Sequence, residues 1–300
     1  MEKSLVSVLI NCYNGENYVE KAIRSAINQS YTNLEIIFWD NKSNDNTSKI
    51  VKNFDDKRIK YYLSKEHTSQ YEARNEALKK CTGEYIAFLD SDDWWDSNKL
   101  VKQMYLFNNP AIGFSCTNAW IVNERNNKKY LAFKKIPNGD PLSNLLKQDF
   151  ITMSSLVVKK DILNKLEYNF NSTYKMIGDF DLVLRLSLLT EFKSTQDPLT
   201  YYRQHFNNLT HTKIILNILE LSELLNQLEK NLSIKNNKNF YIFKNNVLFN
   251  RVLMFSLEGK KKLGIKEMLK IKRIKILIKA MVVLSLPKEI ILKLRSLKNE

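Results

Sequence analysis

Glycine is scarce in this chain, and its positions limit the nucleotide sites that the chain can form. Only seven of the 300 residues are glycine, and none of them lies in a GxGxxG or GxxxxGKS/T motif. Those motifs let backbone amides approach a dinucleotide or a triphosphate closely. The sequence therefore argues against a dinucleotide site and against a P-loop. Any bound phosphate must be neutralised by a metal ion and by Arg or Lys side chains instead.

Cysteine and histidine are also scarce, at three residues each. Cys12, Cys81 and Cys116 are odd in number and show neither CxxC nor metal-ligand spacing, so we expect a reducing, cytosolic compartment. Cys12 and Cys116 lie in apolar stretches and are expected in the core. The histidines are too widely dispersed along the chain to form a zinc motif.

Long apolar runs are absent. The run over residues 5–10 is too short for the core of a signal peptide. The most apolar later stretch, residues 274–286, contains Lys275 and Lys279. It falls short of the roughly 20 apolar residues that span a bilayer. We therefore expect neither an export signal nor a transmembrane helix.

The remaining composition is that of an ordinary globular protein, with 44% apolar and 26% charged residues. A chain of this length can form one large domain or two smaller ones. The net charge of +15 is unevenly distributed along it. Residues 259–300 contain thirteen Lys or Arg against three Glu, and so carry +10 of the excess.

Strands and helices alternate along the first hundred residues. The expected strands are residues 5–10, 34–39, 59–63 and 85–89, and the expected helices are residues 19–27, 48–54 and 70–80. This alternation predicts an α/β fold in which helices flank a mostly parallel, Rossmann-like central sheet. The polar segments that follow the first, second and fourth strands should gather along one edge of that sheet.

The most informative stretch is EYIAFLDSDDWW, residues 84–95, where an apolar strand ends in a cluster of carboxylates. Asp90, Asp92 and Asp93 repel one another, and a divalent cation would compensate that repulsion. Open α/β sheets bind ligands at this edge. Alternatively, Asp90 or Asp93 caps a helix that begins near Trp94. The stretch alone leaves both interpretations open.

Six segments in order carry a family resemblance. They are SVLINCYNGENYVEKAI (7–23), FWDNKSNDNT (38–47), EARNEAL (72–78), GEYIAFLDSDDWW (83–95), GDFDLVLRL (178–186) and YYRQHFNNLT (201–210). The series resembles glycosyltransferase family 2, the inverting enzymes of the GT-A fold that use nucleotide-diphospho-sugars. The resemblance covers residues 4–210 and does not extend to the remainder of the chain.

The resemblance implies that Asn11 and Tyr13 lie against the nucleoside, and that Asp40 and Asn41 reach its base and ribose. The family often has a second acid at position 41. An asparagine can still accept a hydrogen bond from the N3–H of uracil or thymine. A UDP-sugar is therefore the favoured donor, although the base stays open.

Around the diphosphate, Asp90-Ser91-Asp92 resembles the D-x-D motif of the family. The resemblance implies that Asp92 is a direct ligand of Mn²⁺ or Mg²⁺, with Asp90 and His205 as further candidate ligands. Arg74 would face the phosphates, and Arg203 with His205 would close over them. A metal and cations of this kind neutralise the charge that grows on the leaving group.

Asp179 takes the place of the family's catalytic base. Sugar transfer requires a carboxylate that removes the proton of the acceptor hydroxyl, and a base on the opposite face of the sugar gives inversion. The family usually has a Glu before this base, where the present chain has Gly178. Asp181 either replaces that Glu in part or caps a helix over residues 182–189.

For several other residues, a purely structural role is an alternative to a functional one. Trp94 and Trp95 form either an acceptor platform or part of the core. Trp120 and Tyr130 are expected in the core, and His67 is expected to be solvated in a polar loop.

The last third of the chain is predicted to be helical, over residues 214–232, 240–257 and from Lys266 onward. The final segment alternates apolar residues with lysines at helical spacing. A basic amphipathic helix suits an anionic membrane surface, here through residues 259–300. The alternative is a basic face that packs on the protein or on a second copy. No nucleic-acid motif accompanies the charge, so we expect no nucleic-acid partner.

We therefore expect a nucleotide-sugar-binding half over residues 1–100, an acceptor-binding half over 101–210 and a helical basic region over 211–300. The expected activity is metal-dependent, inverting transfer of a sugar to a hydroxyl of a growing surface glycan, such as a lipooligosaccharide, a capsule or a lipid-linked oligosaccharide. The expected location is the cytoplasm, as a peripheral protein on the inner face of the cytoplasmic membrane, and a homo-oligomer stays open. The alternative is a non-catalytic protein of the same fold that docks on a membrane or on a partner glycosyltransferase through its tail.

Overall fold

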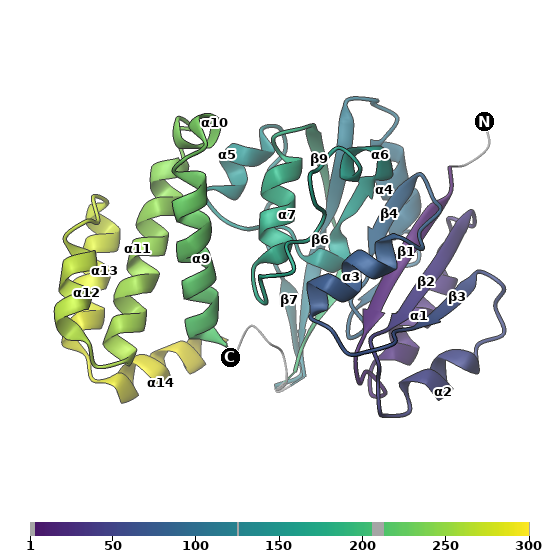
Figure 1. Cartoon of the computed structure of the whole chain (residues 1–300), viewed down its shortest axis with the longest axis horizontal. Helices are drawn as coiled ribbons and strands as arrows, with labels where there is room; N and C mark the ends of the chain where they lie inside the picture. The colour runs from purple at the N-terminus through teal and green to yellow at the C-terminus, as the bar shows by residue number, and fades with distance from the viewer. Residues whose placement is uncertain (1–3, 125, 206–212, 300) are drawn as a thin grey trace. The chain divides into compact units, whose positions relative to one another are not determined.

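The computed structural model of the chain describes residues 4–124, 126–205 and 213–299. These residues divide into two compact units (Figure 1). The first unit lies within residues 1–141 and 150–206, and the second lies within residues 142–149 and 207–300.

The first unit is built on a nine-stranded sheet. Its strands are β1 (Val6–Cys12), β2 (Leu34–Asp40), β3 (Ile59–Leu63), β4 (Tyr85–Phe88), β5 (Trp94–Trp95), β6 (Ile112–Asn123), β7 (Lys128–Leu131), β8 (Val157–Lys159) and β9 (Glu191–Gln204). The strand order is β3-β2-β1-β4-β8-β6-β9-β5, with β7 paired to β6. Strands β3, β2, β1 and β4 are mutually parallel, as the alternating sequence predicted, and the later strands add antiparallel pairs.

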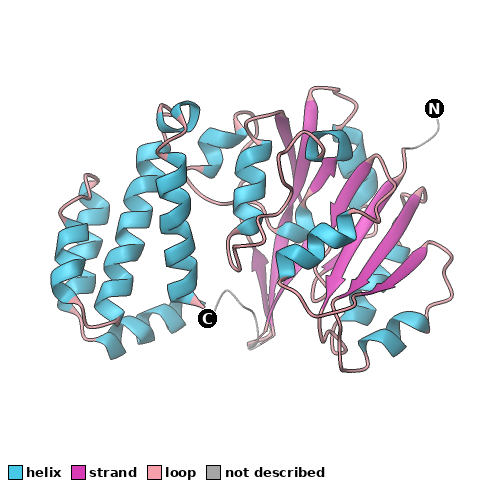
Figure 2. Ribbon diagram, in the orientation of Figure 1, coloured by secondary structure: helices cyan, strands magenta, loops and turns pink. Residues whose placement is uncertain are grey.

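Helices cover both faces of this sheet (Figure 2). On one face, α1 (Val19–Ile27), α2 (Thr47–Lys52) and α4 (Lys99–Leu106) share one apolar cluster with alternate residues of β1 and β2. On the other face, α3 (Gln70–Leu78) crosses in front of the strands in Figure 1. Because the strands are buried on both faces, their runs are almost continuously apolar. Cys12 and Cys116 lie in this core as predicted, and Cys81 is buried as well.

The predicted helix near Trp94 is wrong. Trp94 and Trp95 form the short strand β5, which pairs with β9, and α4 begins only at Lys99, after Asn98. Tertiary contacts hold this segment extended: Trp94 stacks on Tyr201 with ring centroids 5.1 Å apart, and the indole N–H of Trp95 donates to a backbone carbonyl. Neither Asp90 nor Asp93 therefore caps a helix here.

Three further helices of the first unit flank β8. The 3₁₀ helix η1 (Met153–Ser155) precedes β8, and α6 (Lys160–Leu163) and α7 (Gly178–Leu186) lie between β8 and β9. Helix α7 begins four residues earlier than predicted, so Asp179 and Asp181 both lie in its first turn. Acidic side chains are favourable in that position because the N-terminus of a helix is partially positive.

The second unit is helical, as predicted. Its helices are α9 (Ile214–Leu228), α10 (Leu232–Lys235), α11 (Phe240–Leu257), α12 (Lys261–Met268), α13 (Ile274–Ser285) and α14 (Lys288–Asn299), and α5 (Pro141–Leu145) ends in this unit. The basic stretch is broken between α12 and α13. The carbonyl oxygen of the Asn245 side chain accepts hydrogen bonds from the backbone amides of Lys272 and Arg273, which fixes the start of α13. Within the described part of the chain, no helix is both long enough and apolar enough to cross a membrane.

Candidate active site

The acidic segment after β4 lies at the carboxyl ends of the parallel strands, and its three carboxylates have different surroundings. Asp93 is buried, and its two oxygens accept from the Ser154 hydroxyl at 2.5 Å and from the Arg203 amide at 2.9 Å. Burial, together with the nearby Asp92 and Asp90, raises the pKa of Asp93 well above its ordinary value. Asp93 therefore ties the segment to η1 and β9.

Arg74 joins this segment to a carboxylate from a distant part of the chain. Its buried guanidinium donates through Nη2 to Asp90 Oδ1 at 2.5 Å and through Nη1 to Asp179 Oδ1 at 2.8 Å. Burial raises the pKa of Asp90 to about 6, although Arg74 acts in the opposite direction. The planar fork of an arginine can hold two carboxylates at once in this manner. The structure thus brings together Arg74, Asp90 and Asp179, which the sequence analysis had proposed separately.

Asp92 contacts His205, the last described residue of the motif that begins at Tyr201. The Asp92 Oδ2 atom lies 3.0 Å from His205 Nε2, and the His205 ring lies 4.8 Å from the ring of Tyr18. Residues 206–210, the remainder of that motif, lie outside the described part of the chain.

The Asp92–His205 pair has donor atoms that fit a divalent metal ion. Within the described residues, no cluster of three or more His, Cys, Asp or Glu forms a ready-made metal cage. Mg²⁺ in nucleotide sites is commonly held by one or two carboxylates plus phosphate oxygens and water. A carboxylate with an imidazole is a suitable donor set for Mn²⁺ as well. The residues present therefore match a metal that is completed by a diphosphate.

Arg203 lies beside this pair but is itself engaged by the protein. Its Nε donates to the Asp92 carbonyl at 2.6 Å, and its Nη1 forms an ion pair with Glu124. The guanidinium carbon also lies 4.7 Å from the ring centres of both Tyr18 and Trp94. Glu124 could not be predicted as a site residue, because a single acid in the β6–β7 hairpin carries no motif.

A tyrosine fills the space beside the candidate base. A side-chain carbon at Gly178 would stand 2.7 Å from ring atoms of Tyr71, which is closer than real contacts allow. Tyr71 is buried and stacks on Phe170 at 5.7 Å, and its hydroxyl interacts electrostatically with Asp179. This contact explains why the Glu common in the family cannot occupy position 178. Asp181 does not replace it either, because its carboxylate accepts from Arg185 at 2.8 Å.

Tyr13 and His67 face one another on the other side of the sheet edge. Their ring centroids lie 3.9 Å apart, and the His67 Nδ1 atom lies 3.1 Å from the Asn41 carbonyl. Tyr13 is 46% exposed. Nearby, the buried Oδ1 atom of Asn11 has no hydrogen-bond partner in the part of the chain that is described. An exposed aromatic pair beside an unsatisfied acceptor suits a ring-shaped polar ligand.

Asp40 and Asn41 are both buried behind these rings. The Asp40 oxygens accept from the Ser43 amide and the Tyr61 hydroxyl, each at 2.7 Å. The Asn41 side chain exchanges hydrogen bonds with Thr68. The Asn41 side chain thus fixes the loop that carries His67, and the Asn41 amide donates to the carbonyl of Cys12, which precedes Tyr13, at 2.8 Å.

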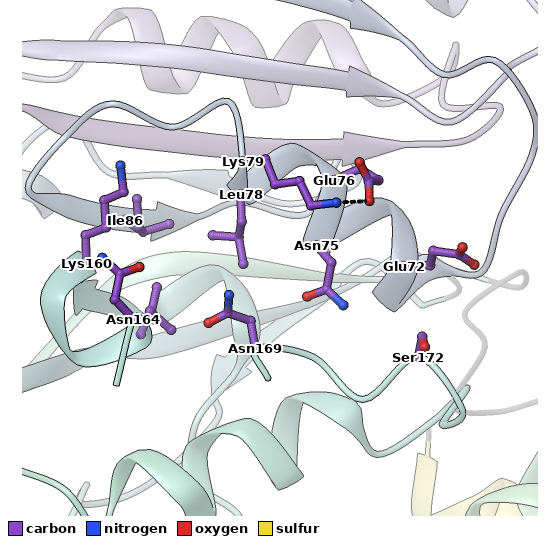
Figure 3. Close-up of a pocket in the computed structure, with 11 residues that line it drawn as sticks. Glu72, Asn75, Glu76, Leu78, Lys79, Ile86, Lys160, Asn164, Asn169 and Ser172 are labelled. Atoms are coloured by element: carbon purple, nitrogen blue, oxygen red, sulfur yellow. Dashed lines mark hydrogen bonds and ion pairs between the residues drawn. The ribbon is translucent and has the colours of Figure 1, made fainter. Parts of the chain in front are cut away.

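A pocket of about 470 Å³ lies beside α3 and α6 (Figure 3). Asn75 lines it and holds the adjoining loop, donating to the Phe170 carbonyl at 2.8 Å and accepting from the Phe170 amide at 3.0 Å. Neither Asp179 nor a candidate metal ligand lines this pocket. The pocket is therefore separate from the acidic strand end.

The remaining aromatic predictions have mixed outcomes. Trp95 is buried in the core, whereas Trp94 is partly exposed beneath the ammonium group of Lys21. Tyr130 is 42% exposed on β7, so the prediction of a core position for it is wrong. All four residues of β7 are exposed, so neither face of this strand is covered, and the local sequence does not reveal that.

The sheet and its acidic edge have the architecture of the GT-A fold. Residues 1–349 of S. aureus TarS, solved in complex with UDP, match it with a TM-score of 0.65 at 18% identity, covering 93% of this chain and 87% of that one. The predicted fold class is thereby confirmed.

The chain belongs to glycosyl transferase family 2, whose family model matches residues 7–166. Two Escherichia coli relatives are named as UDP-Glc:alpha-D-GlcNAc-diphosphoundecaprenol beta-1,3-glucosyltransferases. WfgD is 36% identical to this chain, and the match covers 64% of this chain and 72% of WfgD. WfaP is 30% identical, and the match covers 70% of this chain and 81% of WfaP. The prediction of a glycosyltransferase enzyme is confirmed, and the family resemblance is confirmed with it.

Proposed function

We propose that this enzyme transfers a sugar, with inversion, from a UDP-sugar to a hydroxyl of a lipid-linked glycan at the cytoplasmic face of the membrane. The donor that we favour is UDP-glucose and the acceptor is a GlcNAc-diphospholipid, because the two Escherichia coli relatives carry those names. The glycan made in this way would be a component of a surface polysaccharide.

The observation that carries the proposal is the fork of Arg74. It connects Asp90, in the leaving-group region, with Asp179, from a helix that begins 88 residues later in the chain. Two carboxylates with separate tasks, held at a fixed separation by one cation, match a displacement at a sugar carbon. A protein that only bound nucleotide-sugars would have no need of the second carboxylate.

Asp179 acts as the general base in this proposal. About a third of its side chain is exposed, so an acceptor hydroxyl can approach it. The carboxylate removes the hydroxyl proton while the acceptor oxygen attacks the anomeric carbon from the face opposite the diphosphate. The bond to the diphosphate breaks in the same step, and the configuration of the sugar inverts.

Asp92 and His205 would hold the divalent ion, with Asp90 as a further ligand if Arg74 releases it. When bound, the ion supplies Lewis-acid stabilisation of the charge on the departing diphosphate. Arg203 lies next to Asp92 and can turn from Glu124 to a phosphate, since both partners are anions. The positive charge of Arg74 offsets part of the negative charge of Asp90 and Asp179.

Tyr13 and His67 would enclose the uracil ring, and Asn11 would supply an acceptor to the nucleoside. Asp40 and Asn41 stay candidates for contacts with base and ribose, and their buried hydrogen bonds already position the loops on both sides. The exposed face of Trp94 and Tyr201 is the candidate platform for the acceptor.

The test is a transfer assay with UDP-glucose, Mn²⁺ and a short-chain GlcNAc-diphospholipid, in which UDP release and glycolipid product are both followed. A thermal-shift screen of nucleotide-sugars precedes it, because a ligand that binds only the native state raises the melting temperature. Transfer from one nucleotide-sugar supports the proposal. Binding of UDP-sugars without release of UDP or product, with every acceptor of this class, would contradict it.

A further inference from the structure

The outer face of α13 is apolar where a helix surface in water is normally polar. Ile274, Ile278, Met281 and Val282 are 73%, 55%, 50% and 50% exposed. Ile278, Met281 and Val282 follow Ile274 by four, seven and eight residues, which places all four along one side of the helix. The opposite side, with Ile276 and Ala280, is buried in the core of the second unit. We call the four exposed residues the α13 stripe.

Lysines border the α13 stripe, and acids are missing from the helix. Lys275 and Lys279 each follow a stripe residue directly and are exposed, and the sequence of α13 contains no Asp or Glu. A basic border beside an apolar stripe suits an anionic surface that also has an apolar interior.

The neighbouring helices repeat this pattern. Leu263 and Ile265 of α12 are 45% and 46% exposed, Leu269 after it is 76% exposed, and Ile290 and Leu294 of α14 are 43% and 53% exposed. The segment that contains these helices has the charge excess of +10 described above. A chain evolved for solvent alone would place this charge on the outer face instead of leaving apolar side chains there.

We propose that the α13 stripe and its lysine border dock on the surface of an anionic lipid leaflet. The helix would lie in the interface, with the stripe among the acyl chains and the lysines at the headgroups. A second copy of the chain is a poorer occupant, since it would bring an equally basic border against the first. The docking surface stands on these observations even if the proposed acceptor is wrong.

The experiment is co-sedimentation of the full chain with vesicles of phosphatidylcholine alone and of phosphatidylcholine with 30% phosphatidylglycerol. The variant Ile274→Ser/Ile278→Ser removes apolar surface from the stripe. We expect it to weaken binding to the anionic vesicles roughly ten-fold or more. Lys275→Glu/Lys279→Glu should weaken binding similarly. The difference in vesicle binding between this variant and the wild type should be largest at low salt. These side chains are exposed, so we expect the melting temperature to stay unchanged.

Two control variants change an exposed apolar side chain and an exposed lysine elsewhere in the chain. Tyr105→Ser removes a side chain that is 74% exposed on α4, and Lys193→Glu reverses an exposed charge on β9. Both should bind vesicles like the wild type. Equal sedimentation of the stripe variants and the wild type would overturn the proposal. Absence of vesicle binding together with a dimer that the stripe variant dissociates would overturn it in favour of a second copy.

A second observation concerns the neighbour of the candidate base. We infer that Tyr71 is a positioning residue for Asp179, an inference that rests on the proposed role of Asp179. The ring atoms of Tyr71 lie 2.7 Å from where a side-chain carbon at Gly178 would stand, and the Tyr71 hydroxyl interacts electrostatically with the adjacent Asp179. Arg74 contacts the same carboxylate from the other direction at 2.8 Å. Two side chains therefore restrict how the carboxylate can turn.

Tyr71→Phe tests this inference because it keeps the ring and its stacking on Phe170 while it removes the hydroxyl. We expect kcat to fall roughly ten-fold, with KM for the donor and the melting temperature unchanged. A fall of less than two-fold, or a parallel loss of donor binding and stability, would overturn the inference. Failure of the base assignment is detected separately, because Asp179→Asn would then retain its turnover.

Two further variants test whether the side chains at positions 71 and 178 compete for the same volume. Gly178→Glu alone should fail, because its side chain would collide with the Tyr71 ring. Tyr71→Ala/Gly178→Glu makes room for the Glu and supplies a new polar neighbour to Asp179. We expect this pair to recover activity relative to Gly178→Glu alone, whereas no recovery would contradict the mutual dependence of the two positions.

Discussion

Arg74 and Asp179 are 105 residues apart in the chain, yet the Nη1 atom of Arg74 lies 2.8 Å from the Oδ1 atom of Asp179. The same guanidinium also holds Asp90 at 2.5 Å. The buried guanidinium of Arg74, on α3, therefore contacts a carboxylate on α7 and the acidic segment after β4 at the same time. This contact places the candidate base and the acidic strand end in a single site.

Replacing Arg74 by lysine should uncouple these two carboxylates. Arg74→Lys keeps the charge but lacks the planar fork, so it cannot hold both partners in their positions. We expect kcat for transfer to fall by about 100-fold, because small displacements of reacting groups have effects of that order. UDP release in the transfer assay is the measurement. Arg24→Lys is the control, since Arg24 pairs with Glu20 on the surface, and equal activity of the two variants would contradict the account.

Asp92→Asn should abolish metal-dependent binding of UDP. The amide is a much weaker ligand than the carboxylate, and His205 alone provides one donor. Calorimetric titration of UDP with Mn²⁺ and then with EDTA measures the effect. Asp197→Asn, an exposed acid that pairs with Lys102, should bind like the wild type. Tight UDP binding by Asp92→Asn with an unchanged Mn²⁺ requirement would refute the assignment of this ligand.

Glu35 should stabilise the fold in a pH-dependent way. Burial alone would raise its pKa, but hydrogen bonds from Lys60, Ser7 and Thr82 outweigh burial and lower the pKa to about 2. A carboxyl whose pKa is lower in the folded state stabilises the fold above its unfolded pKa. This stabilisation is lost as the pH falls from about 4.5 towards 2.

Glu35→Gln should therefore lower the free energy of unfolding by about 3 kcal/mol at pH 7. The difference from the wild type should shrink as the pH falls through that window. Urea denaturation at pH 7, 5 and 3 measures it, and Glu84→Gln, on the surface, is the control. A difference that stays constant between pH 7 and pH 3 would show that Glu35 acts through packing.

Gly178→Ala should destabilise the protein by about 1–3 kcal/mol, as overpacking of a buried position does. The added methyl group would stand 2.7 Å from the Tyr71 ring. Thermal or urea denaturation measures the loss. In a Tyr71→Leu background the same change should cost less, since the clash is removed. Equal costs in both backgrounds would mean that the ring can move aside freely.

The fold could be predicted further from the sequence than the site could. Buried parallel strands are visible in a sequence as short apolar runs. The bounds of the strands over residues 34–40 and 59–63 were therefore predicted to within one residue. Trp94 and Trp95 were misassigned because their extended conformation depends on stacking with Tyr201, which is distant in sequence. The gap between α12 and α13 depends similarly on the side chain of Asn245.

The site was predictable only where a motif marks it. The carboxylates of the D-x-D segment and Asp179 follow recognisable patterns, whereas Glu124 and Tyr71 act through contacts that span 79 and 107 residues. His67 was expected to be merely solvated, and its ring lies against Tyr13 because both loops end at the same sheet edge. Topology brings such residues together, and no local pattern in the sequence reports it.

The most direct test of the account is Asp179→Asn, assayed for donor binding and for transfer in the same preparation. The asparagine keeps the shape and a hydrogen bond to Arg74 but cannot accept the acceptor proton. We predict that transfer falls by roughly 1,000-fold while the Kd for the UDP-sugar changes less than about two-fold. Asp161→Asn, an exposed acid, is the matched control. Near-normal transfer by Asp179→Asn would contradict the proposal that Asp179 is the base.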